Sequence, residues 1–207
     1  LKSIPVTKMI DNNKKNNIWE KKINQFIVLT NFAKNKFIQA NFPKNKIKIK
    51  PNFISTKILP DATNDILKKN CLYVGRLSQE KGIKTLLKAW ENISFPLKIF
   101  GDGPLYNKLN KNQPNINFLG EHSRDKIIKE MKLAKFLIFP SECYEGFPMT
   151  VLEAFSLGLP VLASNIGVMK EIIEDNHNGI LFKTGNFIDL NKKIYEGCFE
   201  WLTNNHN

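Results

Sequence analysis

The sequence predicts an α/β protein with a doubly wound parallel sheet, and three observations support this prediction. From residue 71 onward, short apolar runs alternate with stretches of helical periodicity. The links between them are short, so each helix returns the chain to the start of a neighbouring parallel strand. The hydrophobic content of 42% is typical of a globular domain, and no apolar run approaches the ~20 residues that span a bilayer.

The first quarter of the chain has weaker signals. Thr30 or Asn31 can cap a helix whose apolar face includes Phe32 and Phe37, and Pro43 ends it. In chain order we expect a loop over 1–17, a short helix near 19–23, a buried strand over 25–30, a helix over 31–40, a strand over 47–49 and a helix over 64–70.

The remaining elements follow from clearer patterns. Ile83, Leu86, Leu87 and Trp90 stand at i, i+3, i+4 and i+7, the spacing of one helix face. We expect strands over 71–75, 97–101, 116–120, 136–139, 160–163 and 180–182. We expect helices over 83–90, 104–112, 127–134, 149–158, 169–174 and 187–202.

One stretch, 140–161, combines a loop with the start of a helix. Pro148 suits the first turn of a helix that begins near Met149, and Gly158 suits its end. Backbone N–H groups at such a start, with Gly146 allowing close approach, form a site for an anion such as phosphate.

Two carboxylates, Glu145 and Glu153, flank this helix start. A carboxylate accepts hydrogen bonds from hydroxyl groups, as on a ribose or a hexose. The two together with the anion site could hold both the phosphate and the sugar parts of a nucleotide-sugar. Solvated carboxylates that only favour the helix dipole are the alternative for each residue alone.

A second candidate segment places Arg76 just after a strand and Lys81 just before a helix. Arginine can fork onto a phosphate and lysine supplies a compact cation, so a diphosphate suits the pair. Surface charges are the alternative. In a parallel sheet, ligands bind beyond the carboxyl ends of the strands. We therefore expect Arg76, Gly101, Gly120 and residues 140–145 to converge on one crevice.

Other ligand classes are disfavoured. Gly101-Asp102-Gly103 lacks the third glycine of a dinucleotide fingerprint, and no Walker-type motif is present. The three cysteines form no Cys-x-x-Cys pair and the three histidines have no metal-ligand spacing. We expect a reducing compartment, no metal and an incidental thiol at Cys143, with a nucleophile there as the weaker alternative.

The net charge of +12 is concentrated early in the chain, where residues 1–51 hold 12 lysines against Asp11 and Glu20. Such a segment can face an anionic membrane or nucleic acid. Nucleic-acid readers normally use arginines and interleaved aromatic residues. The only arginines are Arg76 and Arg124, so we expect no nucleic-acid partner. The first residues lack the apolar core of a signal peptide, and the start at Leu1 predicts a fragment or a processed start.

The ordered set of motifs resembles the retaining glycosyltransferases of the two-domain GT-B type, family 4 (group 1). The motifs are Val74-Gly75-Arg76 with Lys81-Gly82, Phe100-Gly101-Asp102-Gly103-Pro104, Asn117-Phe118-Leu119-Gly120, the Glu145–Glu153 pair, Gly158-Leu159-Pro160-Val161 and Gly179-Ile180-Leu181-Phe182. The resemblance implies a Rossmann-like carboxy-terminal half of a GT-B fold over 53–207. It also implies that 1–52 is the tail of the amino-terminal, acceptor-side domain.

The resemblance also implies roles for matching positions. Arg76 and Lys81 would bind the donor diphosphate and offset charge as it leaves, Glu153 would bind the ribose, and Glu145 would contact the donor sugar. These three groups, Arg76, Lys81 and Glu145, are the expected catalytic residues. The other expected donor-binding residues are Gly75, Gly101, Leu119, Gly120, Gly146, Phe147, Met149 and Thr150. No metal or cofactor is implied, and the nucleotide-diphosphate sugar is the donor substrate.

The predicted function is sugar transfer to a glycan, lipid or small acceptor, in cell-surface polysaccharide or glycolipid synthesis. The cysteine usage predicts a cytoplasmic protein, and the basic first segment predicts peripheral contact with the inner face of an anionic membrane. Two alternatives stay open: a non-catalytic nucleotide-sugar-binding fragment, and another GT-B enzyme such as a sugar-nucleotide epimerase, because one fold serves several chemistries.

Overall fold

The computed structural model describes residues 4–54, 70–109 and 113–197. The chain divides into two compact units, residues 1–52 and 53–207. Among the described residues, no helix is both long and apolar enough to cross a membrane.

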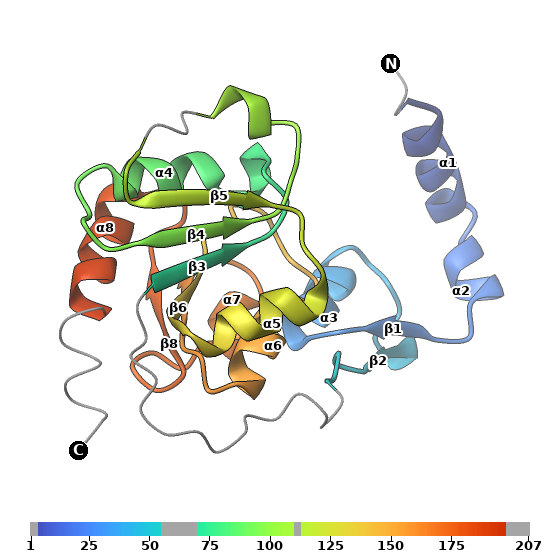
Figure 1. Ribbon diagram of the computed structural model, residues 1–207. Helices are drawn as coiled ribbons and strands as arrows, with labels where there is room; N and C mark the ends of the chain where they lie inside the picture. Colours follow the sequence, from blue (N-terminus) through green and yellow to red (C-terminus); the bar gives the residue numbers. More distant parts are fainter. Residues whose placement is uncertain (1–3, 55–69, 110–112, 198–207) are drawn as a thin grey trace. The chain divides into compact units, whose positions relative to one another are not determined.

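The second unit is built on a six-stranded, fully parallel sheet with the strand order β5-β4-β3-β6-β7-β8 (Figure 1). Its strands are β3 (Asn70–Val74), β4 (Leu97–Phe100), β5 (Ile116–Gly120), β6 (Ala134–Phe139), β7 (Val161–Ser164) and β8 (Gly179–Phe182). The chain runs outward from β3 to β5, then returns to the centre at β6 and runs outward to β8. The predicted doubly wound α/β fold is confirmed, and its switch point lies between β3 and β6.

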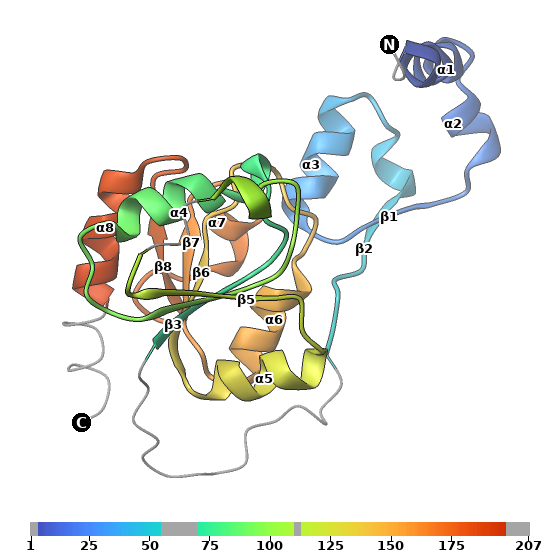
Figure 2. The ribbon, with the colours of Figure 1, turned by 45° about the horizontal axis from the view of Figure 1, so that its top comes forward.

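Helices cover both faces of this sheet. They are α4 (Ile83–Trp90), α5 (Arg124–Lys132), α6 (Met149–Ser156), α7 (Met169–Ile172) and α8 (Phe187–Glu196). Figures 1 and 2 show α4 and α8 side by side. The hydrogen bonds from Asn191 Nδ2 to Ala89 O (2.8 Å) and from Tyr195 Oη to Asn92 O (2.9 Å) join these two helical segments.

Alternating strand residues build two separate hydrophobic cores. Cys71 and Tyr73 of β3 face the core that includes α4 and α8, whereas Leu72 faces the core that includes α5, α6 and α7. The strands are therefore buried on both faces, which explains why they read as near-continuous apolar runs in the sequence.

Two predictions in the second unit are wrong. The segment expected as a helix over 104–112 forms only a 3₁₀ turn, η4 (Tyr106–Lys108), within its described part. The Leu105 N–H donates across the loop to Leu77 O, and the Tyr106 N–H bonds back to Gly103 O, so the backbone closes tight turns instead. Ala134, expected on the helix that follows β5, begins β6 opposite Asn70 because α5 ends at Lys132.

Two expected helices lie partly outside the described residues. Of the helix expected over 64–70, only Asn70 is described, and it belongs to β3. Of the helix expected over 187–202, α8 accounts for Phe187–Glu196, and residues 198–202 lie outside the description.

The first unit contains a β-α-β arrangement in which β1 (Phe26–Val28) pairs in parallel with β2 (Ile47–Ile49). Between them lie α3 (Asn31–Gln39) and a 3₁₀ turn, η1 (Lys44–Lys46). The Thr30 hydroxyl caps α3 by accepting from Ala33 N at 3.1 Å, as predicted. The strand β1 is shorter and less buried than expected, since Ile27 is 64% exposed.

The loop expected over 1–17 is wrong, because α1 (Ile4–Lys15) occupies most of it and α2 (Ile18–Lys22) follows. The overlooked signal is the i, i+3, i+4 spacing of Val6, Met9 and Ile10. It is weak because α1 has no buried residue.

Candidate functional site

The loops that follow β3 and β6 meet at the switch point of the sheet. The Glu142 N–H donates to Glu80 O at 2.8 Å. Gly82 lies against this junction with φ of +69°, and a Cβ there would stand 1.8 Å from Pro140 O. Only glycine fits at this position, so the two loops are held in direct backbone contact.

An ion pair joins the two loops through their side chains. Lys81 Nζ lies 2.6 Å from Glu145 Oε1, and these side chains are 30% and 14% exposed. The Ser141 hydroxyl donates to the same Oε1 at 2.6 Å. Within the described part of the chain, every donor to this carboxylate reaches Oε1, which leaves Oε2 for a hydroxyl of a ligand.

The negative charge of Glu145 acts on a buried tyrosine, Tyr73. Burial raises the pKa of Tyr73, and the negative charges of Glu145 and Glu80 raise it further. The neutral phenol donates to Arg76 O at 2.9 Å and so fixes the backbone of the loop after β3. A hydrogen bond from the Ser78 hydroxyl (2.6 Å) and the nearby charges of Arg76 and Lys81 lower the pKa of Glu80.

The two predicted cations differ in their surroundings. Lys81 is matched by Glu145, whereas the Arg76 side chain is exposed and makes no hydrogen bond or ion pair to any described residue. The structure does not bring the two cations into contact with each other. The exposed guanidinium keeps its donors free for an anion from solution.

Three glycines of the predicted set come together where β3, β4 and β5 end. The Gly75 N–H donates to Phe100 O at 3.0 Å, and the Gly101 N–H donates to Gly120 O at 2.8 Å. A Cβ on Gly101, where φ is +133°, would stand 2.0 Å from Gly75 O. The backbone ends of the three strands therefore form one continuous edge, with Leu119 37% exposed beside it.

The start of α6 is open to a ligand. Its N-cap residue is Pro148, and no side chain caps the helix. The first-turn N–H groups, including those of Met149 and Thr150, have no partner further up the helix, so they suit an anion. Gly146 and Met149 are exposed and Phe147 is half-buried, which leaves this start accessible.

Glu153 lies one turn further along α6 and is 9% exposed. Its Oε1 accepts a hydrogen bond from Arg124 Nε at 2.6 Å. Arg124 begins α5, where the Ser123 side chain caps the helix through Lys126 N. The carboxylate predicted for a ribose is thus nearly buried and is held by a cation that comes from the segment after β5.

Arg124 was not predicted at the site, and Ser141 was predicted there only as part of the loop over 140–145. Arg124 is one of only two arginines among 31 basic residues, and that rarity is the signal that could have found it. Ser141 stands four residues before Glu145 in the predicted loop, but the spacing alone does not reveal a contact.

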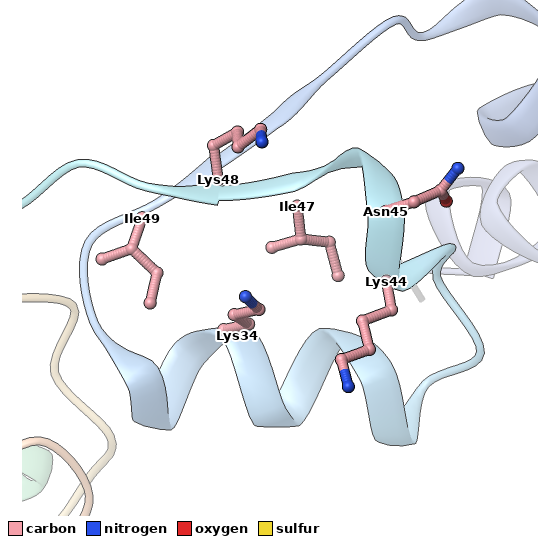
Figure 3. A pocket seen from close by; sticks show the side chains of 6 residues that line it. All are labelled: Lys34, Lys44, Asn45, Ile47, Lys48 and Ile49. Atoms are coloured by element: carbon pink, nitrogen blue, oxygen red, sulfur yellow. The ribbon is translucent and has the colours of Figure 1, made fainter.

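A separate hollow of about 730 Å³ lies in the first unit. It is lined by Lys34, Lys44, Asn45, Ile47, Lys48 and Ile49. Figure 3 shows Ile47 and Ile49 pointing from β2 toward α3, with Lys34 between them. The hollow contains no predicted site residue, and it is an open space between a short helix and a two-stranded sheet.

Several known proteins with sequences similar to this chain are glycosyltransferases. An uncharacterised glycosyltransferase of Methanocaldococcus jannaschii is 37% identical over 130 residues, which are 60% of this chain and 37% of that protein. A GDP-mannose-dependent alpha-mannosyltransferase of Corynebacterium glutamicum is 27% identical over 135 residues, 65% of this chain and 32% of that protein. The chain thus spans about a third of the length of these relatives.

Solved structures have the same fold. HepE of Anabaena, in complex with UDP, aligns with a TM-score of 0.78 and 22% identity over 89% of this chain and 56% of that one. TarM aligns with a TM-score of 0.73 and 26% identity over 89% of this chain and 39% of that one. The family described as glycosyl transferases group 1 matches residues 61–197. This chain therefore belongs to the group 1 glycosyltransferase family, with the GT-B fold that its motifs predicted.

Proposed function

We propose that the second unit binds the nucleotide-diphosphate sugar donor of a retaining glycosyltransferase. The observation that carries this proposal is the arrangement at the switch point. The Arg76 guanidinium, which has no ion-pair partner among the described residues, follows the same strand as Lys81, and the Lys81–Glu145 pair leaves one oxygen of the carboxylate open. This combination suits a ligand with both a phosphate and hydroxyl groups.

Each part of the donor has a matching group. Arg76 and the N–H groups at the start of α6 bind the diphosphate, with Lys81 shared between the diphosphate and Glu145. Glu145 Oε2 accepts a hydroxyl of the donor sugar, and Glu153 accepts from the ribose. The base lies beside the edge formed by Leu119 and Gly120.

The same groups can assist the reaction. When the bond from the sugar to the diphosphate breaks, negative charge grows on the leaving diphosphate. Arg76, Lys81 and the dipole of α6 stabilise that charge, which lowers the barrier. The acceptor hydroxyl attacks from the face that the diphosphate leaves and passes its proton to the diphosphate, so the configuration of the sugar is retained.

The whole enzyme needs an acceptor as well. TarM has been solved with UDP and alpha-GlcNAc-glycerol, and HepE with UDP and glucose. By analogy, we assign the first unit to the acceptor-side domain and the acceptor to a glycan or lipid of the cell surface. The lysine-rich first unit suits a cytoplasmic protein that contacts an anionic membrane surface.

Calorimetric titration of this chain with UDP, GDP and ADP tests the donor site. We expect one of the three to bind, and Arg76→Ala to weaken that binding by about tenfold or more, since a charge-assisted hydrogen bond is lost. The control is Lys129→Ala, which removes one exposed positive charge from α5 and should leave the affinity unchanged. No binding by any nucleotide, from a chain shown to be folded by its melting curve, would refute the proposal.

A further inference from the structure

Arg124 holds Glu153 through a single contact. Its Nε lies 2.6 Å from Glu153 Oε1, and the carboxylate side chain is only 11% exposed while the arginine is 58% exposed. Within the described residues, neither terminal nitrogen of this guanidinium has a partner and no donor reaches Glu153 Oε2. One oxygen of the carboxylate and two N–H₂ groups thus remain available together.

The two side chains are positioned by different elements. Glu153 projects from the middle of α6, and Arg124 opens α5 directly after the loop that follows β5. In that loop the ring of His122 packs edge-on against Phe100, with 5.4 Å between the ring centroids. The pair therefore connects the helix whose start suits the diphosphate with the segment beside the predicted base.

A fold-stabilising role alone does not account for the geometry. An ion pair built for stability alone favours the two-pronged contact that arginine can make with a carboxylate, which uses both oxygens. Here a carboxylate that is nearly buried is fixed through one oxygen only. Fixing one oxygen removes the freedom of the side chain to turn and aims the second oxygen in one direction.

We propose that Arg124 is a positioning residue that determines specificity for a ribonucleotide, by fixing Glu153 Oε2 to accept from the ribose hydroxyls. The inference rests on the donor-binding function proposed above. The terminal nitrogens of Arg124, which have no partner among the described residues, would donate to the oxygen of the same hydroxyl pair. A hydroxyl that both donates to Glu153 and accepts from Arg124 is recognised twice, so its removal is costly.

The test is titration with the ribose and 2′-deoxyribose forms of UDP, GDP and ADP. Four proteins are compared: the unchanged chain, Arg124→Met, Arg124→Lys and Lys126→Met. The last is the matched control, because Lys126 is on the same helix and also pairs with a nearly buried carboxylate, Glu130, at 3.1 Å. Lys126→Met removes one positive charge, as Arg124→Met does, but it leaves the contact between Arg124 and Glu153 in place.

We expect the unchanged chain to bind its ribonucleotide about tenfold or more tightly than the deoxy form. Arg124→Met should reduce this preference to about twofold, Arg124→Lys should keep part of it, and Lys126→Met should keep all of it. An unchanged preference in Arg124→Met overturns the inference, even where both affinities fall equally.

The two proposals fail in different ways. If the unchanged chain binds no nucleotide, the donor site itself is wrong. If it binds a nucleotide and the preference for ribose does not depend on Arg124, only this inference falls. Should Arg124→Met fail to fold, as judged by its melting curve, the comparison with Arg124→Lys decides by the same ratio.

Discussion

Replacing Gly82 by alanine tests whether close backbone contact holds the candidate site together. At this position φ is +69°, and the added Cβ would stand 1.8 Å from Pro140 O. The left-handed backbone conformation alone costs an alanine about 1–2 kcal/mol. Because the colliding atom is a main-chain oxygen and Pro140 is buried, the loops must also separate, which adds about 1–3 kcal/mol by analogy with overpacked cores.

A second glycine separates the cost of the contact with Pro140 from the cost of the left-handed backbone conformation. Gly158 has nearly the same φ, +65°, but no atom lies within 4 Å of its added Cβ. Gly158→Ala therefore carries only the conformational cost. For a chain of this size, 1 kcal/mol shifts the melting temperature by about 2–4 °C. An excess of about 2 kcal/mol should make Gly82→Ala melt about 4–8 °C below Gly158→Ala.

Thermal melting followed by circular dichroism measures this difference directly. Gly82→Ala should also weaken nucleotide binding, because the residue follows Lys81 and separation of the loops disturbs the Lys81–Glu145 pair. Equal melting temperatures for the two variants would refute the reasoning, since the contact with Pro140 would then contribute nothing.

Three further predictions concern stability. Burial acts to raise the pKa of Glu130. The hydrogen bonds from its lysine partners, one of them Lys98 at 2.6 Å, act in the opposite direction and are stronger, so the pKa of Glu130 is lowered. The stabilisation is therefore present above about pH 4.5, the ordinary value, and is lost as the pH falls through the lowered pKa. Urea unfolding curves measured over a series of pH values test this. Glu130→Gln should lower the free energy of unfolding by about 1 kcal/mol at pH 7 and leave it unchanged at the acid end of the series. A difference between the two proteins that does not depend on pH would contradict this. Tyr73→Phe should lower the melting temperature by about 2–4 °C, because the Arg76 carbonyl loses one of its two donors and keeps only the Ser78 N–H, and an unchanged value would mean that water replaces the phenol. Asn186→Ala should lower it by a similar amount, since the Asn186 side chain caps α8 through two backbone N–H groups, and calorimetry that finds no change would exclude that contribution.

The fold of the second unit could be predicted because its signals are strong and local. The strands are buried on both faces, so they read as apolar runs, and α4 carries four core residues at regular spacing. The first unit shows the opposite case, because α1 buries no residue and its four large apolar residues stand out little from a polar background. The described part of the segment over 104–112 fails for another reason, since the Leu105 N–H bonds to Leu77 O rather than along a helix.

Part of the candidate site could also be predicted, because strand order places the carboxyl ends of β3 and β6 together. The pairings of the side chains in the site could not be predicted. Lys81 and Glu145 are 64 residues apart, and Arg124 and Glu153 are 29 residues apart. No sequence period links such residues, so which cation meets which carboxylate depends on tertiary packing. For that reason Arg76 and Lys81 looked equivalent in the sequence, although only Lys81 has a carboxylate partner.

The two ion pairs give the candidate site a property that neither shows alone. Glu145 and Glu153 are each held by one cation through one oxygen, so both carboxylates are oriented before a ligand arrives. Of the three cations, Arg76 alone has no carboxylate partner in the described part of the site. Hydroxyl groups of a donor would therefore meet fixed acceptors, while its diphosphate would meet one free guanidinium and the open start of α6. Binding then requires little ordering of side chains, and preorganisation of this kind favours affinity by lowering the entropy that is lost on binding.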